Sequence, residues 1–282
     1  MMKRLAVLLT ALLLMCTGCL AEYDEEEAYA PGLEETFAGA DAEGEVPDVT
    51  VSGTVAVREP LTRDQLMDFF TDSVFVGDSV SQRFRTYVKD NRKDEPNLLS
   101  NAKFLTVQSY TLFTASKNYV STKHANLTYG GKEMSLCRIM GQMKPRRLFI
   151  LLGINDFIGE KIDKGIEYVT RLVSLVKKYS PDTIIYFQSL TPVTRNFCRK
   201  KDYRTLWDNY NAALRDLSET VDFTYVEIAE RLKDDEGYLP DDWSTDREYH
   251  VNSKGIPVWI DELLDFAQEQ YDLGLWEPEG TK

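Results

Sequence analysis

Residues 73–84 read SVFVGDSVSQRF, and this stretch decides the fold. A run of residues that β-strands favour enters Gly-Asp-Ser, and polar residues at helical spacing follow. The pattern predicts a strand, a tight turn and the start of a helix, which is typical of α/β proteins. Within this stretch alone Ser79 has two interpretations: it belongs to a helix cap, or it is a nucleophile. The rest of the chain must supply the partners that a nucleophile needs.

From residue 60 onward, short apolar runs alternate with amphipathic segments, and Thr62 and Gln65 form a capping box at the first helix. Such runs are typical of strands buried on both faces, so we predict a parallel sheet with helices on both sides. The expected strands are 73–77, 103–108, 147–152, 183–189 and 223–228. The expected helices are 79–90, part of 110–141, 162–179, 201–219 and 253–270. The segment 110–141 is irregular and predicts an excursion loop around Gly130-Gly131.

The N-terminal segment divides into two parts before the predicted domain at 60–275. Residues 1–19 have a short basic start, an apolar run too short to span a bilayer, and Thr17-Gly18 before Cys19. This resembles a bacterial lipobox, which predicts a lipidated Cys19 and anchorage on the outer face of the cytoplasmic membrane. An ordinary signal peptide remains the alternative. Residues 20–59 are rich in acidic and small residues and predict a disordered acidic tether.

The charge distribution argues against nucleic-acid binding, and the cysteine content argues against a zinc site. The net charge is −13, and residues 21–58 hold eleven acidic residues against one basic residue. The folded part is therefore only mildly acidic and offers no large basic surface for nucleic acid. Beyond the N-terminal segment only Cys137 and Cys198 remain, either as buried thiols or as a disulfide. Neither belongs to a Cys-x-x-Cys pair, so no zinc site is expected.

Candidate polar residues lie at three places: after the first predicted strand, after the third, and between the fifth strand and the last helix. They are Ser79, Asn155 and the pair Asp246 and His250. Ligands in such sheets bind beyond the carboxyl ends of the strands, so these side chains are expected to meet. A serine hydroxyl needs a histidine base, and that histidine needs a carboxylate to fix its tautomer. An asparagine amide can donate to the oxyanion, and together the residue types point to acyl transfer.

The segments VGDSVS, LLGINDF and QSLTPVT, with a late Asp and His, resemble the SGNH (GDSL) hydrolase superfamily over roughly residues 70–270. The resemblance implies a three-layer, flavodoxin-like α/β/α fold whose five parallel strands follow the order 2-1-3-4-5. It implies Ser79 as nucleophile, His250 as base and Asp246 as the residue that orients it. It also implies oxyanion donors from Ser79 and Asn155, and supporting roles that we assign to Gly77, Asp78, Gly153 and Asp156. No metal or cofactor is implied.

The sequence departs from the family pattern at two positions. The family spacing is Asp-x-x-His, whereas Asp246 and His250 are separated by three residues, so Asp242 is an alternative orienting residue. The family also places a glycine after its second strand, where its N–H completes the oxyanion hole. Here Gln108 or Ser109 occupies that region, and because any residue except proline can donate an N–H, we assign Gln108 to the oxyanion hole. A residue other than glycine would be strained if the position required a positive φ.

The leading hypothesis is a surface-anchored serine esterase that removes O-acyl groups, with acetyl the favoured one, from extracellular or cell-wall carbohydrate. The alternatives are a non-catalytic glycan-binding lipoprotein and an O-acyltransferase. The expected partners are an acylated carbohydrate or other small ester and, through the lipid, a membrane. His124 and Tyr129 in the excursion loop are either substrate contacts or surface residues.

Overall fold

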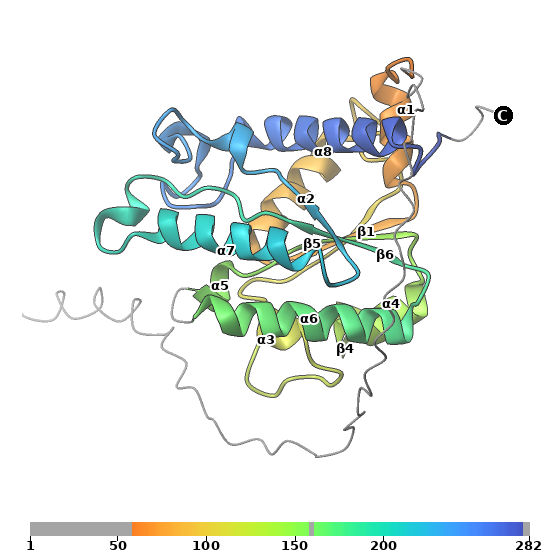
Figure 1. Cartoon of the computed structure of the whole chain (residues 1–282), viewed down its shortest axis with the longest axis horizontal. Coiled ribbons are helices and arrows are strands. Elements are labelled where there is room, and N and C mark those ends of the chain that lie inside the picture. The colour runs from red at the N-terminus through yellow and green to blue at the C-terminus, as the bar shows by residue number, and fades with distance from the viewer. Residues whose placement is uncertain (1–57, 158–160, 279–282) are drawn as a thin grey trace, which may run out of the picture. The chain divides into compact units, whose positions relative to one another are not determined.

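The computed structural model describes residues 58–157 and 161–278, which build a five-stranded parallel sheet between two layers of helices (Figure 1). The sheet order is β2-β1-β5-β6-β7. Numbered within this sheet alone, that order is 2-1-3-4-5, so the predicted topology and fold class are confirmed. The strands are β1 (Ser73–Gly77), β2 (Lys103–Thr106), β5 (Arg147–Leu151), β6 (Ile184–Gln188) and β7 (Thr224–Val226).

Helices cover both faces of the sheet (Figure 1). Helices α2 (Ser79–Asn91) and α8 (Gly255–Asp272) lie on one face, with α1 (Arg63–Met67) beside the end of α8. The other face carries α4 (Leu136–Met143), α6 (Ile162–Tyr179) and α7 (Tyr203–Leu217). The short helices α3 (Leu112–Ala115) and α5 (Ile154–Phe157) follow β2 and β5. Single 3-10 turns lie at 68–70, 197–199, 230–232 and 241–243.

A row of aromatic rings crosses four strands at one level of the sheet. Phe75 of β1 is in register with Phe104 of β2 and with Phe149 of β5, which is in register with Tyr186 of β6. The rings of Phe75 and Phe149 stack at 4.6 Å, and those of Phe149 and Tyr186 at 4.8 Å. Such pairs contribute about 0.5–1.5 kcal/mol each beyond the area that they bury. The row fixes the register of the strands, and therefore the places where they end.

The first and last parts of the domain pack on each other. Phe84 of α2 contacts Trp259 of α8 with ring centroids 4.4 Å apart, and both side chains are buried. At the far end of α8, Arg58 donates to the carbonyl oxygen of Tyr271 and pairs with Glu277. Helix α8 thus runs from the carboxyl ends of the strands to the opposite edge, where the described chain begins.

Most predicted elements match the structure to within three residues at each end. The predicted helix 162–179 coincides with α6, and Thr62 and Gln65 form the capping box that the sequence predicts. In the excursion, a hairpin of β3 (Leu127–Tyr129) and β4 (Lys132–Met134) separates α3 from α4. Its turn is Gly130-Gly131, both at positive φ, which suits a two-residue hairpin turn.

Three other expectations concern cysteines and membrane contact. Cys137 and Cys198 are free thiols, so the disulfide alternative is wrong. Cys19, the lipobox and the predicted tether up to residue 57 lie outside the described residues. Within the two described ranges, no helix has both the length and the apolar character needed to cross a bilayer.

Candidate active site

The carboxyl ends of the strands bring the candidate residues to one edge of the sheet. Ser79 is the first residue of α2, directly after β1, and Asn155 lies in α5, directly after β5. Asp246 and His250 belong to the loop that leads into α8. The topology therefore assembles residues from both ends of the domain, as the positions after the strands predicted.

Ser79, His250 and Asp246 form a continuous hydrogen-bonded chain. The Nε2 atom of His250 lies 2.8 Å from the Oγ atom of Ser79, although 171 sequence positions separate the two residues. The Nδ1 atom of His250 is hydrogen-bonded to the Oδ2 atom of Asp246. The His250 side chain is 18% exposed, so the imidazole is shielded but reachable. This is the geometry that general-base activation of a hydroxyl requires.

The carboxylate of Asp246 is held from its other side as well. Its Oδ1 atom accepts hydrogen bonds from the Oγ atom of Ser244 at 2.8 Å and the N–H of Glu248 at 2.9 Å. Burial acts to raise the pKa of Asp246, but the hydrogen bonds from His250, Ser244 and Glu248 outweigh it and lower the pKa to about 2. Asp246 is therefore ionised wherever His250 would act as a base.

Of the two candidate orienting residues, Asp246 is the one whose carboxylate is hydrogen-bonded to His250. The Oδ2 atom of Asp242 lies 2.9 Å from the Nζ atom of Lys254, at the surface, and the nearby imidazole is bonded to Asp246 instead. The additional residue between Asp246 and His250 is accommodated at Arg247, where the backbone adopts a left-handed conformation with a φ of +60°. The loop therefore accommodates Asp-x-x-x-His without moving the carboxylate away from the imidazole.

The side-chain amide of Asn155 is oriented by two acceptors. Its Nδ2 atom donates to the Oδ2 atom of Asp78 at 2.8 Å and to the carbonyl oxygen of Tyr110 at 3.2 Å. Asp78 also caps α2, because its Oδ1 atom accepts from the N–H of Val80 at 2.9 Å. Asp78 thus fixes both the start of the Ser79 helix and the amide that lies beside it.

Asp78 is a fully buried carboxyl group at this site. Burial raises its pKa to about 7, the N–H of Val80 opposes the rise, and the charge of Asp156 adds to it. In an unfolded chain the pKa of an aspartate is about 3.9. Between these two values the folded protein binds the proton more tightly, so the contribution of Asp78 to stability is complete below about pH 4 and is lost toward pH 7.

We therefore expect Asp78→Asn to flatten the pH dependence of unfolding. Urea titrations at several pH values between 4.5 and 7.5 measure the free energy of unfolding of the parent and the variant. The parent should lose more of that free energy over this interval than the variant, with a slope of up to about 1.4 kcal/mol per pH unit between about pH 5 and 6. Parallel curves for the two proteins would contradict the assignment of this titration to Asp78.

The turn after β2 is hydrogen-bonded to both Gly77 and Asn155. The N–H of Val107 donates to the carbonyl oxygen of Gly77, and the carbonyl oxygen of Tyr110 accepts from Asn155. The positive φ that the family glycine suggests falls on Ser109, at +58°, rather than on Gln108. Among the described residues, the N–H groups of Gln108, Ser109 and Ser79 have no protein acceptor. One backbone donor at the start of α2 and two in the turn after β2 therefore remain available to a ligand.

The supporting residues act through packing and capping. A Cβ atom at Gly77 would lie 1.9 Å from the Oγ atom of Ser81, so only glycine fits between β1 and α2. Gly153 has a φ of +134°, which no larger residue adopts without strain. The carboxylate of Asp156 accepts from the N–H groups of Leu112 and Phe113 at 2.8 and 3.1 Å. Asp156 therefore caps α3.

Sequence reasoning missed the residues that hold the Asp246–His250 loop. Ser244 donates to Asp246, and Thr194, in the loop after β6, contacts the backbone between Asp246 and His250. Hydroxyl groups that bind backbone atoms leave no pattern in a single sequence. His124 packs against Phe113 with ring centroids 5.3 Å apart, and Tyr129 lies in β3. The structure places neither ring in contact with Ser79 or His250.

Other features of the described chain are separate from this site. Within residues 58–157 and 161–278, no group of three or more His, Cys, Asp or Glu side chains could hold a metal ion. A cavity of about 580 Å³ lies at the opposite edge of the sheet, where Ser73, Arg146 and Thr183 line it. It opens at the starts of the strands and does not serve Ser79 or His250.

Comparison with known proteins agrees with this arrangement. Residues 75–256 match the model of the GDSL-like lipase/acylhydrolase family. A GDSL-like lipase from Bacteroides thetaiotaomicron has a TM-score of 0.51 and 14% identity over 71% of this chain and 88% of its own. A carbohydrate esterase family 3 protein from Talaromyces cellulolyticus has a TM-score of 0.51 and 13% identity over 72% of this chain and 98% of its own. A search of curated proteins found no match. Because the family model spans well over half of the sequence and the fold agrees, the chain belongs to the GDSL-like lipase/acylhydrolase family, an esterase family.

Proposed function

We propose that the protein is a surface-anchored serine esterase that removes O-acyl groups, and acetyl groups in particular, from extracellular or cell-wall carbohydrate. The observation that carries the proposal is the 2.8 Å separation between the Oγ atom of Ser79 and the Nε2 atom of His250. Carbohydrate is favoured because the solved structures of similar fold include a carbohydrate esterase and an acetyl esterase.

The proposed reaction begins at the Ser79 hydroxyl. Its Oγ atom attacks the acyl carbonyl carbon while its proton passes to the Nε2 atom of His250. Asp246 keeps Nδ1–H of His250 directed at its carboxylate and stabilises the imidazolium. His250 then returns the proton to the departing sugar oxygen, and the acyl group stays on Ser79. A water molecule, deprotonated by His250, releases the acid and restores the hydroxyl.

The negative charge on the carbonyl oxygen needs donors that are already in place. The N–H of Ser79 belongs to the first turn of α2, whose positive end favours an anion. The turn at Gln108 and Ser109 supplies further free N–H groups, and the Asn155 amide completes the set. The oxyanion replaces the Tyr110 carbonyl oxygen, the more distant of the two Asn155 acceptors, so the stronger bond to Asp78 can persist.

Release of acetate from an acetylated oligosaccharide tests the proposal. The parent protein should release acetate, and Ser79→Ala should not. Binding of the oligosaccharide without release, together with no labelling of Ser79 by a fluorophosphonate, would instead identify a non-catalytic glycan-binding protein. An acetylated second sugar, formed when an acceptor oligosaccharide is added, would identify an acyltransferase.

Anchorage through Cys19 has its own test. A lipidated cysteine would hold the protein at the membrane because each buried CH₂ of an acyl chain contributes about 0.8 kcal/mol. Expressed with its N-terminal segment in a bacterium, the parent protein should sediment with membranes, and Cys19→Ser should move it to the soluble fraction. Equal membrane association of the two proteins would reject the lipid anchor.

A further inference from the structure

We propose that Thr194 is a positioning residue that holds the loop carrying Asp246 and His250 in the register needed to reach Ser79. The inference rests on the proposed function, because it concerns the same site. The hydrogen bonds that Thr194 donates go to Arg247 and Glu248 rather than to Ser79, His250 or Asp246. It acts through the backbone of the residues between the carboxylate and the imidazole, in the part of the loop where this chain has one residue more than the family spacing.

Thr194 makes two short hydrogen bonds to that part of the loop. Its N–H donates to the carbonyl oxygen of Glu248 at 2.7 Å, and its Oγ1 atom donates to the carbonyl oxygen of Arg247 at 2.6 Å. The Thr194 side chain is fully buried. The Nδ2 atom of Asn196 donates to the same Arg247 carbonyl oxygen, but at 3.2 Å. Thr194 is therefore the main partner of the backbone between Asp246 and His250.

The need for this contact follows from the backbone conformation of Arg247. Its φ of +60° lies in the left-handed region, which is unfavourable for a residue other than glycine. Such a conformation persists only where neighbouring contacts stabilise it. The bonds from Thr194 to the carbonyl groups of Arg247 and Glu248 supply this stabilisation. The additional residue then turns outward, and Asp246 and His250 stay in contact.

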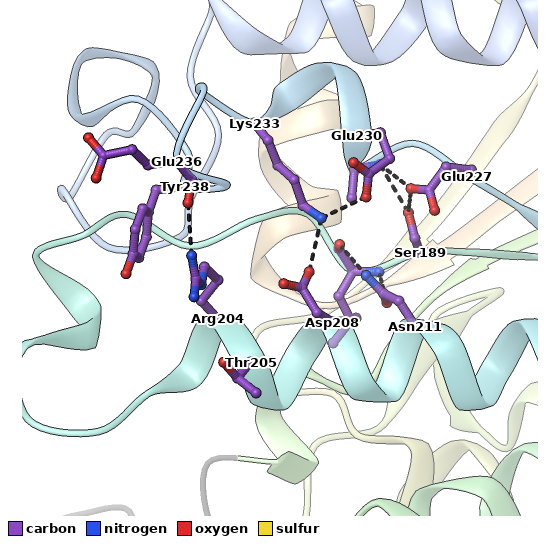
Figure 2. A network of polar contacts seen from close by, with 12 residues as sticks. Ser189, Arg204, Thr205, Asp208, Asn211, Glu227, Glu230, Lys233, Glu236 and Tyr238 are labelled. Carbon is purple, nitrogen blue, oxygen red and sulfur yellow. Dashed lines mark hydrogen bonds and ion pairs between the residues drawn. The ribbon is translucent and has the colours of Figure 1, made fainter.

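Thr194 can act as a fixed reference because its own loop is anchored to the scaffold. Asn211 of α7 accepts from the N–H of Leu190 at 2.8 Å and donates to its carbonyl oxygen at 3.1 Å. Ser189 donates to Glu227 and accepts from the N–H of Ile228, which ties the end of β6 to the loop after β7 (Figure 2). The segment that leads to Thr194 is thus held by α7 and by the loop after β7.

The same loop offers a matched control. Thr191 is also fully buried, and its Oγ1 atom has no hydrogen-bond partner among the described residues. A valine at either position keeps the branched shape and removes only the hydroxyl group. Thr194→Val should therefore affect the site and Thr191→Val should not, although both remove one buried oxygen from the same loop. Thr194→Ser restores the donor and should recover the parent behaviour.

The first measurement is the hydrolysis of a small chromogenic acetyl ester. We expect Thr194→Val to lower kcat by about 10- to 100-fold with KM within about twofold, since a displacement near 1 Å at reacting groups has effects of this size. Thr194→Ser and Thr191→Val should keep kcat within about threefold of the parent. A kcat for Thr194→Val equal to that of the parent would overturn the inference. So would an equal loss in Thr191→Val, or no recovery in Thr194→Ser.

The second measurement does not depend on turnover and separates the inference from the proposed function. The chain has only two histidines, so the NMR signal of the Nδ1 proton of His250, bonded to Asp246, can be assigned directly. The signal should be sharp in the parent and Thr191→Val, and broadened or lost in Thr194→Val. If the parent has no esterase activity but Thr194→Val still broadens the His250 signal, the proposed function is rejected and the positioning role of Thr194 stands. An unchanged signal in Thr194→Val would reject the positioning role.

Discussion

Ser79→Ala is expected to lower kcat/KM for an acetyl ester by about 10⁴-fold or more, while the protein stays folded. The estimate follows from serine hydrolases in which removal of one triad member leaves only binding and oxyanion stabilisation. Ser79 is half-buried at the start of α2, and α2 is capped by Asp78 rather than by Ser79. Loss of the hydroxyl should therefore spare the helix and remove the reaction.

Ser81→Ala is the matched control for this experiment. Ser81 lies two positions later in the same helix and is buried against Gly77. Its replacement removes an equivalent hydroxyl group, and we expect kcat/KM within about threefold of the parent. Equal rates for Ser79→Ala and the parent would reject Ser79 as the nucleophile and would direct attention to another residue.

Asp246→Asn is expected to lower kcat by about 10³- to 10⁴-fold. Both oxygens of Asp246 accept hydrogen bonds: Oδ1 from Ser244 and the N–H of Glu248, and Oδ2 from His250. In asparagine, the side-chain oxygen must accept from Ser244 and the N–H of Glu248, so the NH₂ group must face His250. The Nδ1 atom of His250 must then accept, which places the imidazole proton on Nε2. His250 could no longer take the proton of Ser79.

Asp242→Asn provides the comparison in the same loop. Asp242 makes an exposed ion pair with Lys254, and such pairs contribute little to stability. We expect its kcat to stay within about twofold of the parent. A larger loss in Asp242→Asn than in Asp246→Asn would show that Asp242 orients His250 in solution.

The fold could be predicted from the sequence because its strands are buried on both faces. After Arg147, the run LFILL at 148–152 has no polar residue, and helix α6 has a regular apolar stripe. The existence and the order of these elements could therefore be predicted. Their ends depend on hydrogen-bond register, which a single sequence does not show. The segment 110–141 lacks a sustained period, and only its Gly130-Gly131 turn left a local signal for the hairpin.

The candidate site could be predicted only in part, for a related reason. Parallel strands end at one edge, so the positions of Ser79, Asn155 and His250 after strands or before the last helix implied that they meet. The choice between Asp246 and Asp242 stayed open because it depends on Arg247. Arginine has no preference for a positive φ, and its conformation here is set by contacts with Thr194. Tertiary contacts of this kind leave no local pattern.

The packing of Phe84 on Trp259 has a consequence for the newly made protein. The contact joins the helix that begins with Ser79 to the helix that follows His250, and the second is the last helix of the described chain. Until the chain has been synthesised through α8 and this helix has packed on α2, the hydroxyl has no imidazole beside it. The hydroxyl therefore gains its base only when the C-terminal helix packs on the helix that begins with Ser79.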